Sequence, residues 1–72
     1  ITLKNDDAVD NVNRCIHDYG QYIAGRMGMP YKKYDIKIIN LTLDGPIDKL
    51  KSLEMRLSAI DGVNVKTIYE NT

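Results

Sequence analysis

The sequence has little of several residue types that small proteins use for stability or for chemistry. Its 72 residues include one cysteine, one histidine, no tryptophan and no phenylalanine. One cysteine excludes a disulfide framework within the chain and a structural zinc site built on several thiolates, and it fits a reducing, cytoplasmic setting. One histidine and one thiol leave few side chains that could act as a general base or nucleophile. We therefore expect a protein that is not an enzyme and that needs no cofactor.

Net charge is also missing. Ten lysine and arginine residues balance ten aspartate and glutamate residues, so the formal charge at pH 7 is zero. A neutral chain has no long-range positive field to gather phosphates, which argues against direct nucleic-acid binding. No apolar run approaches the roughly 18 residues of a membrane span, and no signal-peptide pattern is present, so we expect a cytoplasmic protein without membrane contact.

The composition that remains is that of one ordinary globular domain, which we expect to span residues 1–72. Hydrophobic residues make up 43% of the chain and charged residues 28%, as in typical soluble domains. A chain of this length buries only about 60% of its unfolded surface, so the core of a single copy is marginal and self-association is expected. The chain opens inside an expected strand without an initiator methionine, which leaves open whether residues precede Ile1.

Hydropathy patterning predicts six elements in the order β-α-β-β-α-β. Strands are expected at residues 1–4, 21–29, 35–43 and 63–69. One helix is expected to follow the polar cluster of Asn5, Asp6 and Asp7 and to end at Gly20. The other is expected to start at Pro46 and to end at Asp61 and Gly62. This order predicts a ferredoxin-like α+β sandwich, in which a four-stranded antiparallel sheet carries both helices on one face.

Two strands carry features beyond simple alternation. Gly25 and Gly28 interrupt residues 21–29 and predict a bulge or a close backbone approach, and Pro30 is expected to end pairing before a hairpin loop. In residues 35–43, Ile36 and Ile38 lie on the face opposite the other apolar side chains. An apolar second face needs a cover, so we predict that Ile36 and Ile38 form an oligomer interface with another copy of the chain.

The candidate chemical residues are few. Cys15 and His17 point about 200° apart on a helix, so they cannot hold one metal ion, and Cys15 is expected in the core. No metal site is therefore predicted. Arg26, between Gly25 and Gly28, is accessible for a bidentate contact with a carboxylate or phosphate, although a solvated or interface salt bridge explains it as well.

Three segments carry a family resemblance. They are Gly25-Arg26-Met27-Gly28-Met29-Pro30-Tyr31, the preceding His17-Asp18-Tyr19-Gly20, and Gly62-Val63-Asn64-Val65-Lys66-Thr67. Together they resemble the iron-only hydrogenase system regulator family, whose small domains are similar to ACT domains and to the ligand-binding domain of nickel-responsive repressors. The sequence departs from the family in its second helix, where Glu54-Met55-Arg56-Leu57-Ser58 replaces a Gly-Lys-Leu-Gly stretch.

The resemblance implies a regulatory ACT-like domain that forms a homodimer or homotetramer and binds a small effector or a protein partner. In ACT-like domains the effector commonly lies near the first strand-to-helix turn, so it implies a site at Asn5, Asp6 and Asp7, to which we add Arg26, Gly25 and Gly28. Two alternatives stay open: a structural oligomerisation domain without a ligand, and a metal-responsive sensor.

Overall fold

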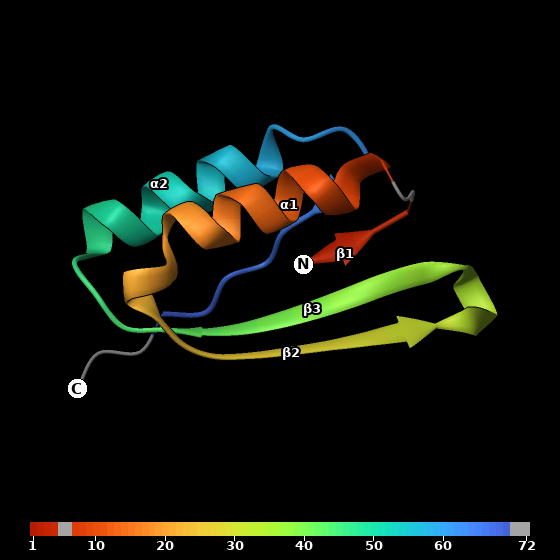
Figure 1. Ribbon diagram of the computed structural model, residues 1–72, viewed down its shortest axis with the longest axis horizontal. Helices are drawn as coiled ribbons and strands as arrows, with labels where there is room; N and C mark the ends of the chain where they lie inside the picture. Colours follow the sequence, from red (N-terminus) through yellow and green to blue (C-terminus); the bar gives the residue numbers. More distant parts are fainter. Residues whose placement is uncertain (5–6, 70–72) are drawn as a thin grey trace.

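Both helices lie on one face of a four-stranded sheet in the computed structural model, which describes residues 1–4 and 7–69 (Figure 1). The elements in chain order are β1 (Thr2–Leu3), α1 (Asp7–Asp18), β2 (Ile23–Tyr31), β3 (Ile36–Leu43), α2 (Ile47–Ser58) and β4 (Val63–Asn64). The strand order is β2-β3-β1-β4, and each described strand pair is antiparallel. This topology confirms the ferredoxin-like fold predicted from the sequence.

The core lies between the sheet and the two helices. Apolar residues at helical spacing place one face of each helix against the sheet. The buried residues are Ala8, Val12, Cys15 and Ile16 on α1, Leu53 and Leu57 on α2, and Leu3, Ile39 and Val63 on the strands. The burial of Cys15 confirms its predicted place in the core.

Strand β2 differs at both ends from the predicted range of 21–29. A 3-10 turn at Gly20–Tyr22 precedes it, so β2 begins at Ile23 and continues to Tyr31. The prediction that Pro30 ends the pairing is wrong, because Pro30 lies opposite Lys37 in the β2–β3 ladder. Since β2 is an edge strand, a proline there can leave its missing N–H on the unpaired side.

The predicted bulge is present next to Gly25. The register shifts between Ile23, which lies opposite Leu43, and Gly25, which lies opposite Thr42. The shift inverts the alternation along β2. Ile23 packs against the core, whereas the odd-numbered residues after the shift lie on the other face of the sheet. Gly28 has no close neighbour, because a Cβ added there would first meet the carbonyl oxygen of Ile38 at 3.9 Å.

Two further predictions about element ends need correction. Gly62 has the left-handed φ of 81° expected of a terminating glycine, but Gly20 does not have a positive φ and instead begins the 3-10 turn. β4 pairs only over Val63–Asn64 and not over residues 63–69, because its neighbour β1 is itself only Thr2–Leu3.

Candidate functional site

The sheet face opposite the helices carries a group of apolar side chains. Residues directly opposite each other on paired strands share a face, and Met29 lies opposite Ile38 and Tyr31 opposite Ile36. We call Met27, Met29, Tyr31, Ile36 and Ile38 the open-face patch. The predicted pair Ile36 and Ile38 is half-buried, and Met27 and Met29 beside it are 58% and 42% exposed.

Sequence reasoning missed the β2 half of this patch. Met27, Met29 and Ile23 all have odd numbers, so simple alternation would put them on the same face of β2. The register shift before Gly25 places Met27 and Met29 on the face opposite Ile23, which packs against the core. The glycine pair was the available signal, because a bulge reverses which residues face the core. Large apolar side chains gathered on one exposed face mark an interaction surface.

Arg26 lies on the helix side of β2. It is opposite Leu41, and its Nη2 atom donates a hydrogen bond of 2.8 Å to Oδ1 of Asn13 on α1. Its side chain is exposed, and the guanidinium carries further N–H donors besides the one that Asn13 accepts. The contact with Asn13 is a surface interaction between β2 and α1.

Of the other predicted effector residues, Gly25 and Gly28 lie with Arg26 on β2, whereas Asp7 lies on α1. Asn5 and Asp6 lie outside the described residues, and Asp7 is the exposed first residue of α1. Asn13, the partner of Arg26, lies about 9 Å further along the helix axis at 1.5 Å per residue. The structure therefore separates Arg26 from the start of α1.

A small hollow lies where β1 ends and the β2–β3 hairpin turns. Its volume is about 190 Å³, and the described residues that line it include Lys4, Lys32, Lys37 and the acidic Asp35. Lysine outnumbers aspartate among these described residues, which suits a small anion. Tyr31 and Tyr34 stack beside it, with ring centroids 5.4 Å apart.

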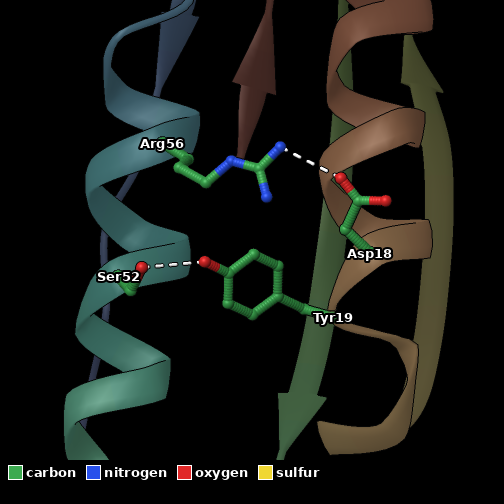
Figure 2. A network of polar contacts seen from close by, with 4 residues as sticks. All are labelled: Asp18, Tyr19, Ser52 and Arg56. Atoms are coloured by element: carbon green, nitrogen blue, oxygen red, sulfur yellow. Dashed lines mark hydrogen bonds and ion pairs between the residues drawn. The ribbon is translucent and has the colours of Figure 1, made fainter.

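A polar network joins the end of α1 to the middle of α2 (Figure 2). The Tyr19 hydroxyl and the Ser52 hydroxyl share a hydrogen bond of 2.8 Å, and Nη2 of Arg56 donates to Oδ2 of Asp18 over 3.1 Å. The hydrogen bond with Ser52, followed by that with Arg56, lowers the pKa of Tyr19. The Arg56 guanidinium also lies 5.3 Å from the centre of the Tyr19 ring. These contacts fasten the two helices together.

Cys15 and His17 do not form a site. Cys15 is buried on α1 and His17 is exposed. Among residues 1–4 and 7–69, no three His, Cys, Asp or Glu side chains gather where they could hold a metal ion. The same part of the chain contains no helix that is long and apolar enough to cross a membrane.

The chain matches a known protein family and a solved structure. Residues 1–67 match the family model "TM1266-like: Iron-only hydrogenase system regulator, putative". The solved structure of the uncharacterized protein TM1266 from Thermotoga maritima is 31% identical in sequence, with a TM-score of 0.88. The similarity covers 93% of this chain and 85% of that chain. No curated protein matches the chain.

Proposed function

This chain belongs to the TM1266-like family of iron-only hydrogenase system regulators, and we propose that it is a regulatory module that assembles with copies of itself through the open-face patch. The family description supports a regulatory role and not a catalytic one. The patch is the observation that carries the self-association. Both helices lie on the other face of the sheet, so this chain's own helices do not cover the patch (Figure 1).

Energetics favour a second copy as the cover. Fully burying one large apolar side chain contributes about 1.5–3 kcal/mol, and Met27, Met29 and Tyr31 are each at least 40% exposed. A face-to-face pair presents the same patch twice and is closed by twofold symmetry. Zero net charge removes the long-range repulsion that would oppose association of identical chains.

The test is the assembly mass of variants that place a charge on the patch. Met27→Lys and Met29→Lys should lower the sedimentation mass to that of the monomer while leaving the circular dichroism spectrum unchanged. Met55→Lys is the matched control, because Met55 is 73% exposed on α2 and belongs to the helix layer. A wild-type monomer, or patch variants with the wild-type mass, would contradict the proposal.

We also propose that the module binds a small anionic effector. Two separate features support this: the lysine-rich hollow at the end of β1, and the exposed guanidinium of Arg26 between Gly25 and Gly28. The first is lined by Lys4 at the end of β1. The family resemblance implies an effector at Asn5, Asp6 and Asp7. Backbone N–H groups at the start of α1 favour an anion there.

Thermal-shift screening with small carboxylates and phosphates tests effector binding, because a ligand of the folded state raises the melting temperature with its excess over Kd. For a hit, Lys4→Ala should weaken binding without unfolding the protein when the effector lies in the hollow, and Arg26→Ala should do so when it lies at Arg26, because one small effector does not reach both. Arg14→Ala on the exposed side of α1 should weaken neither. Assembly without any hit favours a structural oligomerisation domain. Stoichiometric metal in protein purified without chelators favours a metal-responsive sensor.

A further inference from the structure

The lysine-rich hollow beside the β2–β3 hairpin is too small for a whole effector of ordinary size. Its volume is about 190 Å³, whereas pockets for small molecules commonly have about 300–1,000 Å³. The hollow has room for an anionic group, and the remainder of the effector must lie over its rim. The side chains at the rim therefore determine which class of effector this site prefers.

Two stacked tyrosines stand at this rim. Tyr31 lines the hollow, and the ring of Tyr34 stacks on that of Tyr31 with 5.4 Å between the centroids and 7° between the ring planes. Tyr34 is 64% exposed and does not belong to the open-face patch. Because Tyr31 fixes the plane of the neighbouring ring, Tyr34 offers a flat aromatic surface on which a third ring can stack.

One turn carries both this ring and a lysine of the hollow. Lys32 and Tyr34 are the first and last residues of a 3-10 turn. With a rise of about 2 Å per residue, they lie about 4 Å apart along the axis of the turn. The turn ends at Asp35, which has a left-handed φ of 53° and whose N–H donates to the Lys32 carbonyl oxygen at 3.2 Å. The turn therefore places a positive charge and an aromatic ring next to each other.

A second lysine of the turn lies against the ring. The Nζ atom of Lys33 is 5.5 Å from the centre of the Tyr34 ring. Both side chains are exposed, where such a cation–π contact is weak, so a stacked ring can take its place. The displaced ammonium group then adds to the positive charge around the anionic group of the same ligand.

We propose that the effector of this site is an anion that carries a flat ring, the chemistry of a nucleoside monophosphate. Its phosphate would lie in the hollow near Lys4 and Lys32, and its base would stack on Tyr34. This inference rests on the small anionic effector proposed above and adds the ring to it. Zero net charge does not oppose it, because one phosphate needs a local group of lysines and not the long-range field that gathers nucleic acid.

The test compares AMP with its two halves, adenosine and ribose 5-phosphate, by calorimetry and by NMR titration of the full chain. AMP should bind at least about tenfold more tightly than either half, and it should move the Tyr34 ring resonances upfield, whereas ribose 5-phosphate should not. Tyr34→Leu should reduce the affinity for AMP to that for ribose 5-phosphate, and Lys32→Ala should weaken binding of both phosphates. Tyr69→Leu is the matched control, because Tyr69 is 38% exposed and lines a different hollow, of about 480 Å³, between β3 and residues 65–69.

The comparison separates this inference from the proposal on which it rests. Equal affinities for AMP and ribose 5-phosphate, with no movement of the Tyr34 resonances, would overturn the ring and leave the anionic effector in place. Adenosine bound as tightly as AMP would overturn the inference, because the lysines would then contribute nothing. Absence of AMP binding at millimolar concentration would also overturn it, and the screen with small carboxylates and phosphates would then decide the effector site alone.

Discussion

Ile1 and Ile39 exchange two backbone hydrogen bonds across the β1–β3 pair. The Ile1 amino group donates to the Ile39 carbonyl oxygen at 3.0 Å, and the Ile39 amide donates to the Ile1 carbonyl oxygen at 2.8 Å. The amino group is therefore held at the edge of the core while it carries a charge. Burial disfavours that charge and lowers the pKa of the Ile1 amino group from its ordinary value of about 8.

This lowered pKa predicts a pH dependence of stability for the chain that begins with a free amine at Ile1. Between the folded pKa and about pH 8, the unfolded chain binds more protons, so the free energy of unfolding should rise as the pH rises through this window and then level off. Urea denaturation at a series of pH values measures it. Amino-terminal acetylation should abolish the rise, and His17→Gln should retain it. A rise that persists after acetylation would assign it to another group.

The helix-joining network predicts the order in which two tyrosines ionise. Ser52 and Arg56 lower the pKa of Tyr19, so Tyr19 should lose its proton below the ordinary pKa of tyrosine. The hydrogen bond between Tyr69 and Glu54 raises the pKa of Tyr69, so Tyr69 should lose its proton later. Ring resonances followed by NMR between pH 8 and 12 measure both. Ser52→Ala should move the Tyr19 titration upward and leave Tyr69 in place. No movement of Tyr19 would exclude Ser52 as a cause of its shift.

Two glycines should respond oppositely to alanine. Gly62 has φ of 81°, where a Cβ costs about 1–2 kcal/mol, so Gly62→Ala should lower the free energy of unfolding by that amount. Gly20 has no positive φ, and a Cβ there meets no heavy atom within 4 Å. Gly20→Ala should therefore be neutral or stabilise by up to about 1 kcal/mol. Urea denaturation compares the two variants, and equal losses would contradict the argument from φ.

The core between the sheet and the helices predicts a large loss of stability when one buried leucine is truncated. Leu53 is 1% exposed, so Leu53→Ala should cost about 2–5 kcal/mol through lost burial and a cavity. That loss is comparable with the whole stability of a domain this small, at about 0.05–0.15 kcal/mol per residue. Leu53→Met should cost less than about 1.5 kcal/mol and keep a measurable transition. Met55→Ala, on the exposed side of α2, is the control and should change stability by less than about 0.5 kcal/mol.

The sequence predicted the molecule best where the surroundings of a residue depend only on the helix or strand that contains it. The helical position of Cys15 predicted its place in the core, and its burial confirms this. Ile36 and Ile38 were predicted on the second face of their strand, and the register confirms this. Their role as an interface is a proposal that the assembly mass tests.

Features that depend on pairing with a neighbouring strand were predicted less well from the sequence. The alternation of residues 63–69 is that of a strand, yet pairing stops at Asn64 because β1 offers no further partner. Pro30 was expected to end a strand, but at the edge of the sheet it does not. For the candidate site, no pattern in the chain indicated that Arg26 would bond to Asn13 or that three lysines would line one hollow.

The sequence by itself determined the element order, the ferredoxin-like fold and the place of Cys15 in the core, because helical and strand periodicities are local and a βαββαβ order admits few topologies. Only the tertiary structure decided that Met27 and Met29 join Ile36 and Ile38 on one open face, and that a hollow of about 480 Å³ lies between β3 and residues 65–69. Both depend on the register between strands, which a bulge or a short neighbour changes without altering the pattern of either strand alone.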